Sequence, residues 1–70
     1  MPDPTILVRI NQVPHTLPQG ATLADAIARV EIRPPFAAAV NLQFVPKHDY
    51  PHRLLHNDDQ IELIAPITGG

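Results

Sequence analysis

Proline spacing limits what this chain can fold into more than any other feature of its sequence, because nine prolines divide 70 residues into short segments. Proline fixes its own φ and has no N–H group, so it ends helices and is largely confined to the edges of sheets. The chain has no cysteine, so neither a disulfide nor a thiolate metal site can add to its stability. We therefore expect one small domain, near the lower size limit for a single apolar core.

The first segment that follows the N-terminal prolines predicts a strand over residues 5–11. Its apolar side chains alternate, which places three of them on one face: Ile6, Val8 and Ile10. Asn11-Gln12 is the expected turn, and residues 13–17 would return antiparallel. Because Pro14 cannot donate to a central ladder, this second strand is expected at an edge of the sheet.

The next segment predicts a helix of about ten residues, close to the mean length in globular domains. Thr22 can cap its first turn, and Asp25 completes a pair of the capping-box kind. The apolar residues then follow a helical period at Leu23, Ala26, Ile27 and Val30. Pro34-Pro35 must end this helix.

The remaining segments predict short strands. Residues 37–42 are expected to form a strand, which residues 44–45 continue after a tight turn. Residues 48–56 are expected to be irregular or to form a single helical turn. The last strand is expected over residues 60–65, with Ile61 and Leu63 on one face. Phe36 and Phe44 are expected in the core. This order predicts an α+β fold, a mixed sheet of four to five strands packed on one main helix. It matches the ubiquitin-like β-grasp, in which the first and last strands are central, parallel neighbours.

Charge and hydropathy exclude two classes of function. The net charge is −2 and no basic stripe with interleaved aromatic residues is present, so a nucleic-acid binder is not expected. No apolar run approaches the length of a membrane span, and we expect no leader before the fold. We expect a cytoplasmic domain without a membrane partner.

The last five residues, Pro66 to Gly70, are expected to form a flexible tail beyond a β-grasp domain of residues 1–65. Pro66 ends strand pairing, Ile67 and Thr68 follow, and Gly69-Gly70 can pass through a narrow slot because glycine has no Cβ atom. Five extended residues reach roughly 16–18 Å, enough to enter the active site of another protein.

The chain resembles the ThiS family, the sulfur carrier proteins of thiamine biosynthesis. The most specific shared segment is Ala39-Val40-Asn41-x-x-Phe44-Val45-Pro46-Lys47-x-x-Tyr50, which is similar to the family's A-V-N-G-x-F-V-P-R-x-x-Y/W hairpin. Residues 57–59 stand where the family has a D-G-D turn, and Gly69-Gly70 matches its terminus. Leu42 and Asp58 replace glycines of the family pattern, so we expect those two turns to be shaped differently.

The resemblance implies a carrier that is a cosubstrate and not an enzyme. A ubiquitin-activating-type adenylyltransferase would use ATP to adenylate the Gly70 carboxylate, and a sulfur donor such as a cysteine desulfurase would then leave a thiocarboxylate. Thiazole synthase would receive the sulfur. The carrier itself would bind no cofactor.

Other candidate residues have weaker support. Leu7 and Ile64 fall on the face opposite the core and are hypothesised to form part of a docking patch for the partner enzymes. His48, His52 and His56 have helical spacing, but Pro51 interrupts a helix there, and no metal site is expected.

Three alternatives remain open from the sequence. The small subunit of molybdopterin synthase shares the fold and the diglycine tail, although it is typically longer. A ubiquitin-like modifier would join Gly70 to lysines, and a regulatory β-grasp domain would carry an inert tail. No nucleophile–base or metal constellation supports an enzyme.

Overall fold

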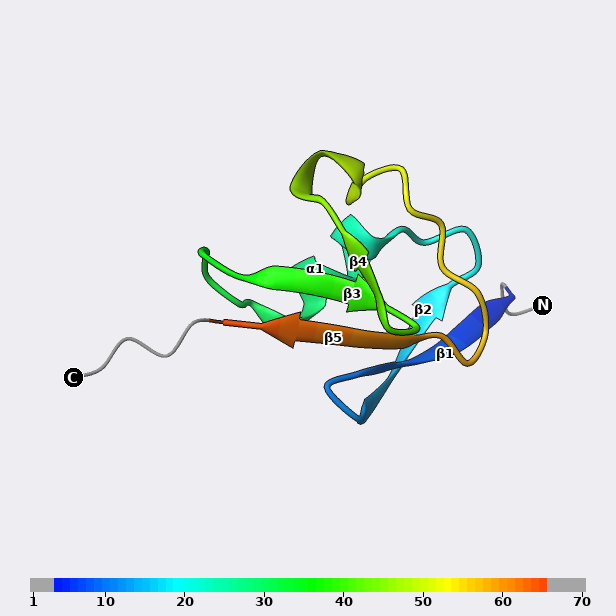
Figure 1. The fold of residues 1–70 in the computed structure, drawn as a ribbon. Coiled ribbons are helices and arrows are strands. Elements are labelled where there is room, and N and C mark those ends of the chain that lie inside the picture. Colours follow the sequence, from blue (N-terminus) through cyan, green and yellow to red (C-terminus); the bar gives the residue numbers. More distant parts are fainter. Residues whose placement is uncertain (1–3, 66–70) are drawn as a thin grey trace.

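The computed structural model describes residues 4–65, which form a five-stranded sheet and one α-helix (Figure 1). The elements are, in order, β1 (Thr5–Ile10), β2 (Val13–Pro18), α1 (Leu23–Val30), β3 (Ala37–Val40), β4 (Gln43–Val45), the 3₁₀ helix η1 (Lys47–Asp49) and β5 (Gln60–Ile64). The strand order is β2-β1-β5-β3-β4. β1 and β5 are parallel, whereas the other neighbouring pairs are antiparallel. This confirms the predicted α+β architecture, with the first and last strands as central neighbours.

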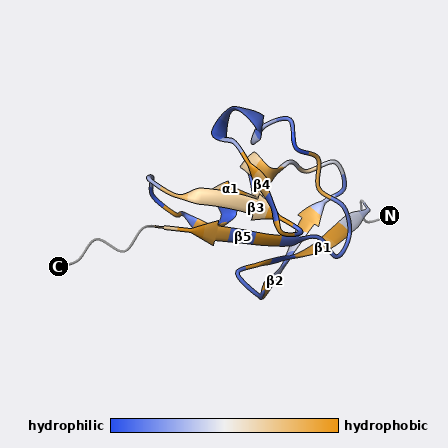
Figure 2. Cartoon of the chain, in the orientation of Figure 1, coloured by the Kyte–Doolittle hydropathy of each residue, from blue (hydrophilic) through white to orange (hydrophobic). Residues whose placement is uncertain are grey.

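The core lies between the sheet and α1, which is behind β3 and β4 in Figure 1. Buried and exposed residues alternate along β1 and β5, as predicted from their sequences. Figure 2 shows the resulting apolar colouring of the strands. The buried apolar side chains are Ile6, Val8, Ile10, Leu17, Ala21, Leu23, Ala26, Ala38, Val40, Val45, Leu55, Ile61 and Leu63.

Helix α1 begins at the predicted cap. The Asp25 N–H donates to Thr22 Oγ1 over 3.4 Å, and the Thr22 N–H donates to Asp25 Oδ2 over 2.9 Å, which completes a capping box. Leu23 and Ala26 are buried, while Ile27 and Val30 pack partly buried against the core. Among residues 4–65, no helix is long and apolar enough to cross a membrane.

The two aromatic residues expected in the core have different positions. Phe36 packs against the core and stacks on Tyr50, with ring centroids 6.0 Å apart. Phe44 was also expected in the core, but its side chain is exposed, with a relative exposure of 70%, so this prediction was wrong. The reason is strand alternation: Val45 points into the core, and its neighbour Phe44 must therefore point to the opposite face.

The strand positions follow the prolines and turns, although two strand ends differ from the expected bounds: β2 extends to Pro18 and β3 is shorter than expected. β2 is an edge strand that contains Pro14 and Pro18, as its prolines require. β3 ends at Val40, earlier than the expected Leu42, because Asn41 and Leu42 form a hairpin turn with φ of 51° and 69°. Asp58 also has a positive φ of 70°. Leu42 and Asp58 thus adopt the left-handed backbone that glycine favours, although neither is a glycine. The expected difference in turn shape is therefore not seen in φ at these two residues.

The segment between β4 and β5 contains only a short helical turn, as expected. Of the three histidines with helical spacing, only His48 lies in η1, so they do not share a helix. Leu55 anchors this segment: its side chain is buried and its N–H donates to the Ala21 carbonyl over 2.9 Å. The segment therefore packs against the start of α1.

Candidate functional site

The residues expected to carry the chemistry, Pro66, Ile67, Thr68, Gly69 and Gly70, lie outside the described residues 4–65. The structure does describe the strand that leads to them. β5 ends at Ile64, and Ala65 precedes Pro66. Because β5 is the central strand of the sheet, hydrogen-bonded to β1 and β3, the segment that precedes the tail starts from the middle of the fold.

The C-terminal end of β5 is bound by a side chain from the β1–β2 turn. β1 turns away from β5 at Asn11, whose φ is 52°. The Leu63 N–H donates to Asn11 Oδ1 over 2.9 Å, and Asn11 Nδ2 donates to the Leu63 carbonyl over 3.2 Å. The carboxamide has one donor and one acceptor in the arrangement of a peptide group, so it extends the parallel ladder beyond the end of β1.

The N-terminal end of β5 is bound by the corresponding residue of the other hairpin. The Gln60 N–H donates to Asn41 Oδ1 over 3.0 Å, and the Asn41 N–H donates to the Gln60 carbonyl over 2.7 Å. Asn41 Nδ2 also donates to Oδ1 of Asp59 over 3.0 Å. Asp59 is the one buried acidic side chain among residues 4–65, and its Oδ2 accepts the His56 N–H over 2.8 Å. Its carboxylate therefore has a structural role in the turn.

The face of the sheet opposite α1 has an apolar patch next to the end of β5. Phe44 is paired with Ala39 in the β3–β4 ladder, and Ala37 is paired with Ile64 in the β3–β5 ladder. Cross-strand partners share a face, so these four side chains lie on the same face, where Glu62 is paired with Ala39 between them; we call the four apolar residues the outer patch. Phe44 and Ile64 are its exposed members, at 70% and 57%.

The two residues predicted for docking lie at opposite ends of this face. Ile64 is the last residue of β5. Leu7 lies beside the residues that precede β5, since its carbonyl accepts the Asp58 N–H and its N–H donates to Asn57 Oδ1. The structure therefore does not bring Leu7 and Ile64 together. The sequence analysis missed that Phe44 lies on the same outer face as Ile64, although its position directly before an inward-facing Val45 was a usable signal.

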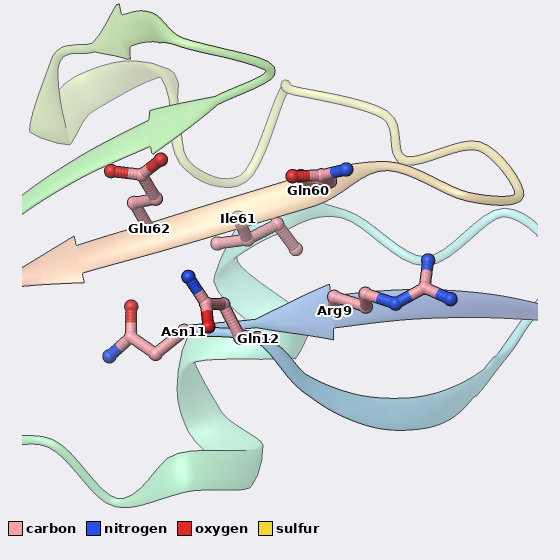
Figure 3. Close-up of a pocket in the computed structure, with 6 residues that line it drawn as sticks. All are labelled: Arg9, Asn11, Gln12, Gln60, Ile61 and Glu62. Carbon is pink, nitrogen blue, oxygen red and sulfur yellow. The ribbon is translucent and has the colours of Figure 1, made fainter.

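A shallow polar groove of about 290 Å³ runs along the junction of β1 and β5. Figure 3 shows the residues that line it, from β1 and the turn after it on one side and from β5 on the other: Arg9, Asn11, Gln12, Gln60, Ile61 and Glu62. The side chains that line it include no serine, cysteine or histidine that could act as a nucleophile or base beside Glu62. Within residues 4–65, no group of three or more His, Cys, Asp or Glu side chains could hold a metal ion.

Comparisons with known proteins agree with the resemblance found in the sequence. None of the curated proteins shows significant sequence similarity to this chain. A crystal structure of the thiamine biosynthesis protein ThiS from Geobacter metallireducens superposes with a TM-score of 0.76 at 12% identity, and the match covers 93% of this chain and 100% of that one. At that identity the likeness supports the shared fold alone. The model of the ThiS family matches residues 6–70, nearly the whole chain, and the protein therefore belongs to the ThiS family.

Proposed function

We propose that this protein carries sulfur on Gly70 for the synthesis of the thiamine thiazole ring. Membership in the ThiS family supports the role of a sulfur carrier in thiamine biosynthesis. The structural observation that carries the proposal is the central position of β5, which joins the segment before Pro66 to the most extensively bonded part of the sheet. The tail thus starts from the middle of the sheet, and a partner can act on its end.

The proposed cycle has an activation step and a sulfur-transfer step on Gly70. A ubiquitin-activating-type enzyme joins the carboxylate to AMP, with release of pyrophosphate from ATP, because a free carboxylate has no good leaving group. The outer sulfur of a persulfide on a donor such as a cysteine desulfurase then attacks the carbonyl carbon, and AMP leaves, which gives an acyl disulfide. A thiol reductant cleaves this disulfide by bonding to the cysteine sulfur of the donor, and the thiocarboxylate is released. The thiocarboxylate passes its sulfur to thiazole synthase. The partner enzymes supply the catalytic groups, so the carrier is their cosubstrate. The cycle is proposed to take place in the cytoplasm.

Docking is proposed to use the outer patch. Ile64 stands two residues before Pro66, so a partner that binds Pro66 to Gly70 in its active site also lies close to Ile64. Phe44 extends the apolar area across β3 to the edge of the sheet. An exposed apolar cluster of this kind is typical of protein interaction surfaces. Leu7, at the far end of the face, would contact only a partner that covers the whole sheet.

The decisive experiment is the intact mass of the protein isolated from its native cell under mild, non-reducing conditions. We expect a species heavier by the difference between sulfur and oxygen, with the modification on Gly70. The same species should form in vitro from ATP, a sulfur donor and the activating enzyme, and deletion of Gly70 should abolish it. Lysine-linked adducts to other proteins would instead identify a modifier. A stable complex with a molybdopterin synthase large subunit would contradict the thiazole assignment.

The docking surface has a matched test. Ile64→Glu and Leu7→Glu place the same charge on exposed apolar positions at opposite ends of one face. We expect Ile64→Glu to raise the KM for the activating enzyme about tenfold or more, because a carboxylate must be desolvated in the interface. Leu7→Glu should change KM less. An unchanged KM for Ile64→Glu would show that the outer patch is not the docking surface.

A further inference from the structure

We infer that Asn11 is a positioning residue for the C-terminal tail: its carboxamide holds the end of β5 in the orientation that partner enzymes accept. The inference rests on the proposed function, since it assigns a role in loading the tail. It starts from the two hydrogen bonds between the Asn11 side chain and the backbone of Leu63. Leu63 stands three residues before Pro66, so among the hydrogen bonds that the structure describes for residues 4–65, this contact of β1 and its turn lies nearest to the tail.

The backbone of β1 cannot make this contact itself. Its last bond to β5 runs from the Asn11 N–H to the Ile61 carbonyl over 2.8 Å. The left-handed conformations of Asn11 and Gln12, with φ of 52° and 70°, then turn the chain into β2. In a parallel ladder the next donor on β5 would be the Leu63 N–H, and here it finds Asn11 Oδ1 in place of a backbone carbonyl.

Without the carboxamide, the end of β5 would be bonded on one side only. β3 pairs with Leu63 and Ile64 through Ala38 and Ala37. On the other side, the Leu63 N–H and carbonyl would lose both partners. The last residues of β5 would then open more readily, and a partner would have to order them when it binds the tail. That ordering lowers affinity and leaves the chemical step unchanged.

The choice of variant separates this role from a general loss of stability. Asn11→Gly removes the carboxamide and keeps a residue that adopts positive φ without strain. Gln12→Gly is the matched control, since it makes the same change at the next residue of the turn, where the side chain is exposed. Asn11→Asp is the conservative variant, because it keeps an acceptor for the Leu63 N–H and loses the donor to the Leu63 carbonyl.

The first readout is amide hydrogen exchange followed by NMR. Comparing Asn11→Gly with Gln12→Gly, we expect exchange of the Leu63 N–H to accelerate about tenfold more than exchange of a core amide such as that of Val8, which follows the global stability of each variant. Asn11→Asp should lie between them. Equal Leu63 exchange in the two glycine variants would overturn the inference, because it would mean that the carboxamide does not hold this end of β5.

The second readout is adenylation by the activating enzyme. Asn11→Gly should raise KM for the carrier about fivefold and leave kcat within about twofold, whereas Gln12→Gly should change neither. If wild type and Asn11→Gly are adenylated with the same KM, the positioning role is overturned and the proposed function stands. If the wild-type protein is not adenylated at all, the proposed function fails, and the positioning role fails with it.

Discussion

The two hairpin turns of the sheet have nearly the same backbone, yet they bind opposite ends of β5 with different strength. Asn11 and Gln12 have φ of 52° and 70°, and Asn41 and Leu42 have 51° and 69°. In each turn the asparagine Oδ1 accepts an N–H from β5, that of Leu63 in one case and of Gln60 in the other. The same local geometry is thus used twice, once at each end of the central strand.

The difference lies in what surrounds each asparagine. At the start of β5, Asn41 also bonds the buried carboxylate of Asp59, which in turn accepts the His56 N–H. At the end of β5, the Asn11 side chain bonds only the Leu63 backbone among residues 4–65. The start of the strand is therefore held by a network and the end by a single side chain and β3. A strand arranged in this way is expected to open from the end that leads to the tail.

The largest expected effect comes from Asp59. In Asp59→Asn one oxygen becomes an NH₂ group, and a single amide oxygen cannot accept from both Asn41 and His56. We expect a loss of about 2 kcal/mol in the free energy of unfolding, measured by urea denaturation. Asp58→Asn makes the same change at an exposed neighbour and should cost less than about 0.5 kcal/mol. Equal effects of the two variants would contradict the network at the start of β5.

A direct comparison of the two turns uses Asn41→Gly and Asn11→Gly, which both keep the positive φ. We expect Asn41→Gly to lower the free energy of unfolding by about 2 kcal/mol and Asn11→Gly by about 1 kcal/mol, because only Asn41 bonds a charged group. Urea denaturation of both proteins measures the difference. A larger loss of stability for Asn11→Gly would mean that the C-terminal end of β5 is held more strongly than its N-terminal end, contrary to our expectation.

The side chains of β5 should show the same asymmetry. Ile61 is 1% exposed and Ile64 is 57% exposed. Removal of one methyl group in Ile61→Val should cost about 1 kcal/mol, as is usual in a packed core. The same change in Ile64→Val should cost less than about 0.3 kcal/mol, since no cavity is left. Thermal unfolding of the two proteins side by side provides the test.

The smallest expected effect is a gain. Leu42 is 85% exposed and holds a positive φ, a conformation that costs a residue with a Cβ atom about 1 kcal/mol. Leu42→Gly should therefore raise the free energy of unfolding by up to about 0.5 kcal/mol, the rest being offset by the greater freedom of glycine in the unfolded chain. Gln12→Gly, at the matching position of the other turn, should raise the free energy of unfolding by a similar amount. A loss of stability in Leu42→Gly would mean that the Leu42 side chain contributes packing.

Local patterns were enough to predict the elements of this fold. The alternation around Val8 and Ile61, the cap at Thr22 and the position of Pro14 each depend on near neighbours in the sequence, and all are confirmed. The parallel placement of β1 and β5 came from fold analogy, because periodicity does not encode which strands pair. The expected structure of the tail, from Pro66 to Gly70, stays a prediction.

Features that depend on register could not be predicted in the same way. Leu7 and Ile64 share a face, but only the pairing of Arg9 with Gln60 reveals that they lie at opposite ends of it. The roles of Asn11 and Asn41 are of the same kind. Turn chemistry predicted Asn11 in a turn, yet its bond to Leu63 spans 52 residues of sequence. The error at Phe44 is different, since the alternation with Val45 was visible and the large aromatic side chain outweighed it.

The prolines of β2 affect how readily copies of this protein could aggregate through the exposed edge of the sheet. The Arg9 N–H points to β5, so its partner Pro14 has its nitrogen on the side away from β1, and the same holds for Pro18 opposite Thr5. Of the three residues of β2 whose nitrogens face outward, Pro14, Thr16 and Pro18, only Thr16 has an N–H to offer. A second chain that approached this edge would find almost no donors to pair with. The β2 edge is thereby protected from aggregation by strand pairing, while the face of the sheet opposite α1 stays accessible to partners.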